Sequence, residues 1–597
     1  MSTLEADDVR WDLSDLLDGA DDEASVDALL DRADALTAEL ATGRGTVASW
    51  DVDGLVRFMT SQAELSELIG RVGSWAGLRF ATDVNDPTRG ALMQRVEERA
   101  TAMSTQLLWF ELEWAALEDD HVDQLLADER LAFAAHHLRS ARRYRDHLLS
   151  EPEERILTEK SITGSSAWSR LFNELTSTIE VQLDGRTTTL EEGLSRLGSP
   201  SPETRAGAAA AVTEALRPGL RTRAFVFNTL LHDKAVDDRL RGYPTWISSR
   251  NLSNEASDES VQALVDAVQA RYDVPQRWYR LKAQVLGVDR LKDWDRMASL
   301  ATEDEPMNFG EAKDLVLESY ASFSPELADV ATRFFDENWI DAPALPGKRP
   351  GAFCAYTVPS VHPYVFLNWT DRRRDALTLA HELGHGLHAY LARPQGVYHQ
   401  GTPLTLAETA SVFGETVTFG RLLDETKDPA ARLALLAENL EGSIATVFRQ
   451  TAMNRFEDAA HNARRTEGEL SVERIGELWA QSQEAMLGDA VEVTEGYRSW
   501  WSYVPHFIGT PGYVYAYAYG QLLALSVYRQ YTEQGSDFVP RYLHLLSAGG
   551  SMAPEELGKI VGCDLADPSF WDGGLDILEE QLEAAESAAF EAGRITR

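Results

Sequence analysis

Apolar residues recur at helical spacing through most of this chain, and proline and glycine seldom interrupt them. Over residues 24–146 they alternate with acidic and basic residues in the pattern of amphipathic helices. With 597 residues, the chain is too long for one ordinary hydrophobic core. We therefore predict a mainly α fold of two lobes: an N-terminal helical lobe over residues 1–195 and a second lobe over residues 196–597.

Two short segments have the character of β-strands. Residues 179–183 and 187–190 flank Asp184-Gly185, a pair typical of the tight turn in a β-hairpin. The apolar run at residues 364–367 predicts another strand, and the Pro- and Gly-rich stretch at residues 341–350 predicts a loop. We therefore expect a hairpin near residues 179–190 and a small β-sheet close to the motif described next.

Residues 371–392 are expected to form one helix. Thr370 is placed to cap its start, and Asp371 is favoured there by the helix dipole. Pro394 limits how far the helix can run. This helix carries the segment His381-Glu382-Leu383-Gly384-His385, an H-E-x-x-H motif.

Two histidines four positions apart on a helix project from one face and can bind a single metal ion. In this motif His381 and His385 are the expected ligands. Glu382 neighbours the first of them, so it can reach a water on the metal without binding the metal itself. Catalytic zinc usually takes three protein ligands and keeps one position open for water, so a third ligand is required.

The best candidate for the third ligand is Glu408, 23 positions after His385. Thr405 can cap a second helix that would pack across the first. Glu415, two turns after Glu408 on the same face, is expected either to accept the second ring proton of a ligand histidine or to form a salt bridge. His388 is expected beside the ligands or in the core.

An H-E-x-x-H motif with a metal-bound water is typical of enzymes that hydrolyse peptide bonds. Hydrolysis of an amide also needs hydrogen-bond donors for the oxyanion that develops on the carbonyl. Residues 504–520 contain His506, a Gly- and Pro-rich loop, and four tyrosines at alternate positions. Tyrosines spaced in this way cannot all face one side of a helix. Either some of them pack away from the site, or part of the stretch is not helical.

The segments His381-Glu-Leu-Gly-His385, Ala407-Glu408-Thr-Ala-Ser411 and Pro505-His506-Phe507 resemble oligoendopeptidase F, within the thimet oligopeptidase-like metallopeptidases. Further segments extend the resemblance over nearly the whole chain: Trp11-Asp-Leu-Ser-Asp15, Thr163-Gly-Ser-Ser-Ala-Trp-Ser-Arg170, Ser249-Arg-Asn-Leu-Ser-Asn254 and Pro350-Gly-Ala-Phe-Cys354. The resemblance implies a helical fold with a deep internal channel that admits peptides and excludes folded proteins.

The resemblance also implies the roles of the site residues. One zinc ion per chain would be bound by His381, His385 and Glu408, with Glu382 as the general base. His506 and tyrosines after it would stabilise the transition state. Tyr513 and Tyr517 are our choices, although the loop at residues 509–512 is less aromatic than in related sequences.

The function predicted from these features is a zinc metalloendopeptidase that hydrolyses internal bonds of short unfolded peptides. The strand at residues 364–367 could pair with the substrate backbone. The same ligands also accept manganese or cobalt. The alternatives are a zinc exopeptidase of the carboxypeptidase type and a catalytically inactive peptide-binding protein.

The charge of the chain limits its partners. There are 96 acidic against 56 basic residues, a net charge of −40, so nucleic acids and anionic membranes are poor partners. We interpret the excess as adaptation to high salt in a halophilic source. No run of apolar residues is long enough for a transmembrane helix, no secretory signal is evident, and only two cysteines occur. A cytoplasmic location is expected.

Overall fold

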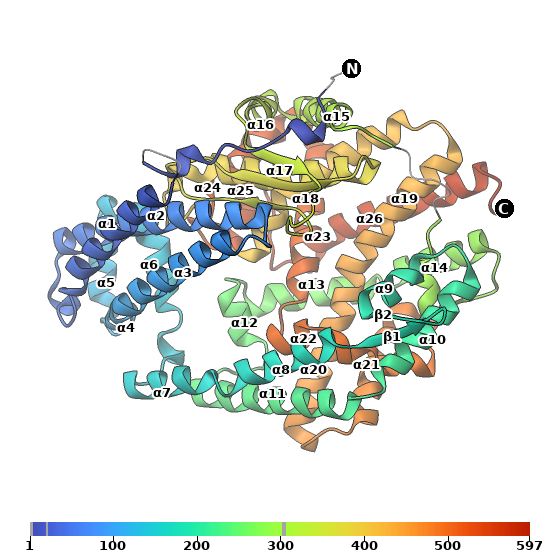
Figure 1. Ribbon diagram of the computed structural model, residues 1–597, viewed down its shortest axis with the longest axis horizontal. Coiled ribbons are helices and arrows are strands. Elements are labelled where there is room, and N and C mark those ends of the chain that lie inside the picture. The colour runs from blue at the N-terminus through green and yellow to red at the C-terminus, as the bar shows by residue number, and fades with distance from the viewer. Residues whose placement is uncertain (1–3, 19–21, 301–305, 597) are drawn as a thin grey trace. The chain divides into compact units, whose positions relative to one another are not determined.

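A computed structural model describes residues 4–18, 22–300 and 306–596 of the chain, and it is mainly helical, as predicted (Figure 1). Its tertiary contacts define two compact units, each built from three separate segments. Unit 1 comprises Met1–Arg145, Asp304–Leu422 and Gln530–Asp564, and unit 2 comprises Asp146–Glu303, Leu423–Arg529 and Leu565–Arg597. Residues 195 and 196, between which the sequence places a lobe boundary, both lie in unit 2. We describe each compact unit by itself, and the division at that point stays a prediction.

Unit 1 begins with a group of antiparallel helices. Acidic N-caps start the first three, because Asp22, Asp51 and Asp86 accept backbone N–H groups of the first turn. Their apolar faces pack against one another. The helices are α1 (Glu23–Ala41), α2 (Val52–Thr82), α3 (Pro87–Leu107), α4 (Trp109–Ala115), α5 (Asp119–Leu126) and α6 (Ala135–Arg142).

The rest of unit 1 surrounds a three-stranded sheet with the order β4-β6-β5. Strand β6 is central, since β4 pairs with it in parallel and β5 in antiparallel orientation. The strands are β4 (Ile340–Pro343), β5 (Phe353–Ala355) and β6 (Tyr364–Trp369). The helices are α15 (Phe309–Phe323), α16 (Pro325–Asp336), α17 (Arg373–Ala392), α24 (Val539–Ala548), α25 (Pro554–Ile560) and most of α18 (Leu404–Glu425).

The strand predicted at residues 364–367 is confirmed as part of β6, but the loop predicted at residues 341–350 was partly wrong. Residues 341–343 belong to β4, which is fixed by the buried ammonium group of Lys348. Its Nζ lies 2.6 Å from the Asp341 carboxylate and donates to the carbonyls of Pro343 and Leu367, each at 2.7 Å. Such a long-range anchor cannot be read from a local Pro/Gly pattern.

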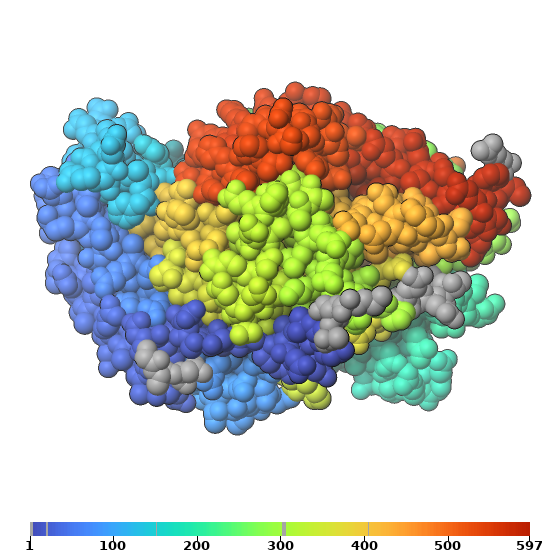
Figure 2. Space-filling view, turned by 90° about the horizontal axis from the view of Figure 1, so that it is seen from above, coloured from blue at the N-terminus to red at the C-terminus, as the bar shows by residue number. Residues whose placement is uncertain are grey.

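The N-terminal segment runs along this sheet. Asp12 N–H donates to the carbonyl of Asn338 at 2.9 Å, and Ala342 N–H donates to that of Val9 at 3.1 Å. The ring of Trp11 lies 5.7 Å from that of Phe366. Figure 2 shows the dark blue N-terminal residues bordering the green residues of this region.

In unit 2, the predicted hairpin is confirmed. Strands β1 (Glu180–Leu183) and β2 (Arg186–Thr189) are antiparallel, and Asp184 and Gly185 both have positive φ, at 52° and 78°. A second, parallel pair joins β3 (Leu291–Lys292) to β7 (Val491–Glu492). The helices are α7 (Glu151–Ser161), α8 (Ser165–Ser177), α9 (Leu190–Ser195), α10 (Pro202–Leu216), α11 (Leu220–Arg241), α12 (Ser248–Ser253), α13 (Asp258–Ala270), α14 (Asp273–Leu286), α19 (Pro429–Ser443), α20 (Gln450–Glu467), α21 (Val472–Leu487), α22 (His506–Gly509), α26 (Pro568–Glu591) and most of α23 (Tyr515–Gln534).

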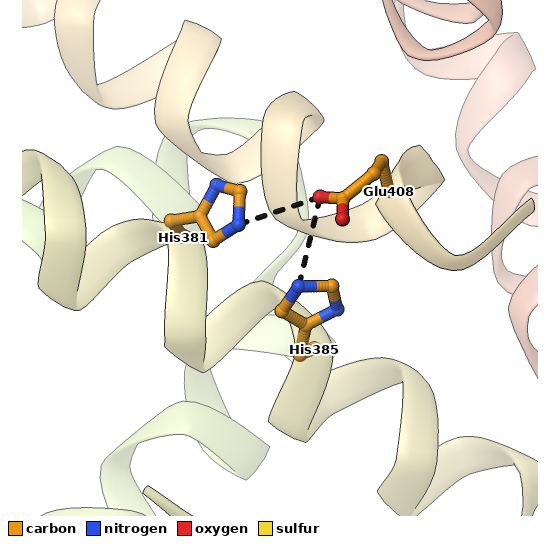
Figure 3. Close-up of side chains that lie close together, drawn as sticks. All are labelled: His381, His385 and Glu408. Carbon is orange, nitrogen blue, oxygen red and sulfur yellow. Dashed lines mark ion pairs between the residues drawn. The ribbon is translucent and has the colours of Figure 1, made fainter. Parts of the chain in front are cut away.

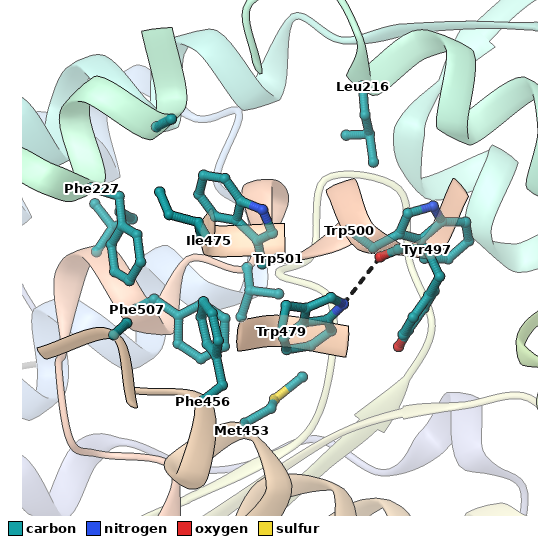
Figure 4. Close-up of a cluster of buried hydrophobic side chains, with 14 of the residues drawn as sticks. Leu216, Phe227, Met453, Phe456, Ile475, Trp479, Tyr497, Trp500, Trp501 and Phe507 are labelled. Atoms are coloured by element: carbon teal, nitrogen blue, oxygen red, sulfur yellow. Dashed lines mark hydrogen bonds between the residues drawn. The ribbon is translucent and has the colours of Figure 1, made fainter. Parts of the chain in front are cut away.

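The core of unit 2 is rich in aromatic side chains (Figure 4). Phe456 of α20 lies with its ring centroid 5.0 Å from that of Phe507 and 5.4 Å from that of Trp479. The indole N–H of Trp479 is satisfied by the carbonyl of Tyr497 at 3.1 Å. Phe507 follows His506 directly, so this core fixes the backbone that carries that histidine.

The helix carrying the H-E-x-x-H motif starts two residues later than predicted. Helix α17 begins at Arg373, and Asp375 in its first turn accepts the N–H groups of two residues that precede the helix, Arg372 and Thr370. Thr370 is therefore a donor and not the cap, which corrects that expectation; the end at Ala392 agrees with it. None of the helices in the described ranges is both long enough and apolar enough to cross a bilayer.

Candidate functional site

Helices α17 and α18 cross in close contact, and a glycine inside the motif permits this. A Cβ atom at Gly384 would lie 2.6 Å from Cα of Ser411, a distance that real Cβ atoms essentially never show. The sequence prediction of a second helix across the first is thus confirmed. Thr405 does not cap that helix, because α18 already begins at Leu404.

This crossing brings the three predicted ligands together (Figure 3). Oε2 of Glu408 lies 3.4 Å from Nε2 of His381 and 3.6 Å from Nε2 of His385. One ligand atom from each residue lies within 4.8 Å of the others, the one such group found among the described residues. Zinc bonds of 2.0–2.2 Å in a tetrahedron give ligand–ligand distances of about 3.3–3.6 Å, so the donor set fits an ion of that size.

A second carboxylate orients the first histidine. Oε2 of Glu415 lies 3.1 Å from Nδ1 of His381, which leaves Nε2 facing Glu408. The contact fits either role expected for Glu415, because it is an ion pair when His381 is protonated and a hydrogen bond from the second ring N–H when Nε2 binds a metal. Ser411 Oγ donates to Oε2 of Glu408 at 2.7 Å and holds that carboxylate as well.

The charges around His381, His385 and Glu408 favour a bound cation. Burial lowers the pKa of His381, but the hydrogen bond to Glu415 and the charges of Glu408, Glu415 and Glu382 raise it to about 9. Burial lowers the pKa of His385 to about 4. Three carboxylates therefore surround two imidazoles, an excess of negative charge that a divalent ion would compensate.

Glu382 is buried beside this group, with 8% of its surface exposed. Burial raises its pKa to about 7, and the charge of His381 opposes that rise. Its carboxylate also accepts the backbone N–H of Cys354 in the edge strand β5. A carboxyl group that titrates near neutral pH can both accept and return a proton.

His388 lies in the core and not among the ligands. It is 2% exposed, and neither ring nitrogen has a hydrogen-bond partner among the described residues. Burial lowers its pKa to about 3, so the ring is neutral. This agrees with the core position expected as one of its two alternatives.

Sequence reasoning missed two residues at this group, Cys354 and Tyr356. The ring of Tyr356 lies 6.4 Å from that of His385. Burial raises the pKa of its phenol, and the charges of Cys354, Glu408 and Glu382 add to that rise. The available signal was the segment Pro350-Gly-Ala-Phe-Cys354, but strand β5 is only three residues long and gives no periodicity to detect.

In unit 2, His506 forms a cluster with two of the four tyrosines. Its Nε2 lies 3.3 Å from the hydroxyl of Tyr517, and its ring stacks on Tyr513 at 6.2 Å between centroids. Tyr515 and Tyr519 are fully buried instead, and Tyr513 precedes helix α23. Both alternatives raised by the alternating spacing therefore hold. Burial lowers the pKa of His506, so the ring is neutral at neutral pH.

Comparisons with known proteins place the chain in a family. The sequence profile described as peptidase family M3 matches residues 197–577, and one described as oligopeptidase F matches residues 113–180. The chain belongs to peptidase family M3. This confirms the family resemblance, and membership makes the chain a metallopeptidase by class.

Relatives of this M3 peptidase align over most of its length. Oligopeptidase PepF of Bacillus subtilis is 27% identical over 560 residues, which are 92% of this chain and 83% of the relative. Group B oligopeptidase PepB of Streptococcus agalactiae is 28% identical over 545 residues, which are 89% of this chain and 90% of the relative.

Solved structures show the same fold. The crystal structure of oligoendopeptidase-F from Enterococcus faecium has a TM-score of 0.72 and 21% identity, covering 95% of this chain and 99% of that one. A crystal structure from Chlamydophila abortus has a TM-score of 0.87 and 22% identity, covering 98% and 99%. These likenesses establish the mainly α peptidase fold.

Proposed function

We propose that this M3 peptidase is a zinc-dependent endopeptidase that cuts internal bonds of short, unfolded peptides. The observation that carries the proposal is the group formed by His381, His385 and Glu408, with the buried carboxyl of Glu382 beside it. The oligopeptidase names of its relatives support short peptides as substrates. The deep channel that the resemblance implies stays a prediction.

His381, His385 and Glu408 would hold one zinc ion, with Glu415 orienting the first histidine. When bound, zinc supplies a water whose pKa is lowered towards about 7 and polarises the scissile carbonyl. Manganese or cobalt would fit the same nitrogen and oxygen ligands.

Glu382 acts as the general base. Its carboxylate accepts the proton of the attacking water and then delivers it to the leaving amine. Before substrate binds, the Cys354 N–H donates to this carboxylate. A general base of this kind needs a pKa near the working pH, which burial provides.

His506, with Tyr513 or Tyr517, donates hydrogen bonds to the oxyanion that forms on the scissile carbonyl. The contacts within this cluster support the assignment, because the Tyr517 hydroxyl meets the same imidazole on which the Tyr513 ring stacks. A donor of this kind contributes about a hundredfold to a thousandfold in rate.

Strand β5 binds the substrate backbone. The strand predicted at residues 364–367, which we expected could pair with the substrate, is not free to do so, because β6 is paired on both sides. Strand β5 has one free edge within the described sheet, and its Cys354 lies next to Glu382. Main-chain pairing would give weak sequence preference, since it ignores side chains.

The first experiment is cleavage of a doubly blocked, internally quenched peptide of about ten residues in high salt. We expect internal cutting that a chelator abolishes and added zinc restores. Trimming of an unblocked peptide alone would indicate an exopeptidase. No cleavage of either peptide by the zinc-loaded protein would indicate a peptide-binding protein. A cytoplasmic location and a halophilic source stay predictions from the sequence.

A further inference from the structure

The interior of unit 2 contains an acidic side chain that forms no ion pair within 4.0 Å among the described residues. Glu457 of α20 is 1% exposed. Its Oε1 accepts the backbone N–H of Gly512 at 2.9 Å, whereas Oε2 has no partner among the described residues. Buried polar atoms are nearly always paired, so an acid retained in such a place calls for an explanation.

The group that Glu457 binds belongs to a turn held from two sides. Gly512 has φ of +74°, in the left-handed region, and follows Pro511, whose carbonyl accepts the Nε–H of Arg250 at 3.3 Å. A Cβ atom at Gly512 would lie 3.3 Å from the ring of Trp246. The turn is thus clamped between α20 and the residues that precede and form α12.

Trp246, which precedes α12 and packs against the turn, is itself bonded to α20. The indole N–H of Trp246 donates to Asp458 Oδ1 at 2.7 Å, and its ring stacks on His461 at 4.4 Å between centroids. Asp458 and His461 both lie within four residues of Glu457 on the same helix. The two sides that hold the turn are therefore connected to each other and are not independent contacts.

The residue that leaves this turn is Tyr513. Its N–H donates to the carbonyl of Thr510 at 3.1 Å, and its ring stacks on His506 and meets Tyr517 edge-on, 5.2 Å between centroids. Any shift of the peptide at Gly512 moves the Tyr513 backbone directly. The position of the phenol against His506 thus depends on the clamp.

We propose that Glu457 and Arg250 are positioning residues, which clamp the Pro511–Gly512 turn and thereby hold Tyr513 in register with His506 and Tyr517. This inference rests on the proposed role of Tyr513 as an oxyanion donor. Neither residue is assigned a contact with the substrate or with the metal ligands; each acts through the turn.

The protonation of Glu457 determines which variant is conservative. Burial raises its pKa to about 8, against the lowering effects of the Gly512 hydrogen bond and the charge of Arg250. The side chain is therefore mainly a neutral acid at pH 7, and its carbonyl oxygen is the acceptor. Glutamine keeps both the shape and the neutral acceptor, whereas leucine keeps only the volume.

The test is steady-state cleavage of the quenched peptide by the zinc-loaded full chain at pH 7. We expect Glu457→Leu to lower kcat at least tenfold with KM changed less than about threefold, and Glu457→Gln to keep kcat within about threefold. Glu484→Leu removes an exposed acid of α21 and is the matched control, with kcat unchanged. Zinc content and the unfolding midpoint are measured for every variant.

A double-mutant cycle decides whether the effect passes through Tyr513. If it does, Glu457→Leu combined with Tyr513→Phe loses no more kcat than Tyr513→Phe alone. Losses that multiply, or wild-type kcat in Glu457→Leu, would overturn the clamp while leaving the oxyanion role intact. Wild-type kcat in Tyr513→Phe would instead refute the proposed role of Tyr513, and the clamp with it.

Two further variants keep the test valid if Glu457→Leu does not fold. Arg250→Met retains the aliphatic stem but removes the donor to Pro511, and Gly512→Ala strains the turn while Glu457 stays in place. Each should lower kcat at least tenfold with KM nearly unchanged. Full activity in both would overturn the proposal.

Discussion

At the scale of single residues, burial of Glu382 suits the general-base role proposed for it but lowers the stability of the fold above pH 4.5. Its pKa in the folded protein is about 7, above the ordinary value of 4.5. Folding therefore favours the protonated form, and the stability contribution of this group is lost as pH rises from 4.5 through 7. In metal-free protein at pH 8 the fold must hold a buried carboxylate.

We therefore predict that Glu382→Gln stabilises the metal-free protein in a pH-dependent way. The gain should grow from less than about 1 kcal/mol at pH 5 to about 3 kcal/mol at pH 8. Unfolding midpoints at the two pH values measure it, with Glu326→Gln, an exposed acid of α16, as the control. The zinc-loaded variant should bind metal normally and cleave nothing. An equal gain at both pH values would contradict the assigned pKa.

The prediction for Glu415 separates orientation of a ligand from ligation. Glu415→Gln removes the charged acceptor of the His381 ring proton but none of the three predicted ligands. We expect zinc affinity to fall about tenfold to a hundredfold, and activity to return at saturating zinc. Competition with a chromophoric chelator measures the affinity. Loss of all zinc binding would instead make Glu415 a ligand.

At this scale, the candidate metal ligands could be predicted from the sequence because local spacing determines where they lie. His381 and His385 lie one helical turn apart, and Glu408 follows within one helix-loop-helix, so their convergence could be anticipated. Cys354 and Glu457 could not, because their roles depend on contacts with Glu382 and Gly512, at positions that no periodicity relates.

At the scale of secondary-structure elements, the site depends on how closely α17 and α18 approach. Gly384 lies against the backbone of Ala410 and Ser411, less than one helical turn from Glu408 in α18. A methyl group there cannot be accommodated by moving a flexible side chain, because the nearest atoms are main-chain atoms.

Gly384→Ala should therefore separate the two helices and displace Glu408 from the histidines. We expect zinc affinity to fall more than tenfold and the unfolding midpoint to drop, although alanine favours helices intrinsically. Gly420→Ala, on α18 with open space around its Cβ position, is the control and should leave both unchanged. Normal zinc affinity in Gly384→Ala would show that the helices can part without moving Glu408.

Element prediction succeeded where the pattern was long or the turn specific. The helix of the motif and the hairpin at Asp184-Gly185 followed from periodicity and turn chemistry. Strand β4 was mistaken for a loop because a buried lysine, and not strand propensity, holds it. The central position of β6 was missed because pairing order depends on two partners that the sequence does not identify.

At the scale of the whole molecule, each compact unit is built from three segments that lie far apart in the sequence. Mainly α character and family were predictable because both are properties of many residues together. The grouping into units was not, since it depends on which segments return to the same core.

The charge of the whole molecule leads to the last prediction. Of the eight lysines, Lys282 and Lys348 are buried in internal ion pairs, so they compensate little of the surface excess in a chain with a net charge of −40. Self-repulsion at low salt should destabilise the fold, and screening should relieve it.

Between 0.01 M and 0.3 M potassium chloride, the Debye length falls from about 30 Å to less than 10 Å. We expect the unfolding midpoint of the zinc-loaded protein to rise by several degrees over this range and then to level off. Effects of salt on hydrophobic burial need higher concentrations, so a rise confined to this range is electrostatic. A midpoint that stays flat up to 0.3 M would show that the acidic surface imposes no repulsion on the fold, and the interpretation of the composition as salt adaptation would then fail.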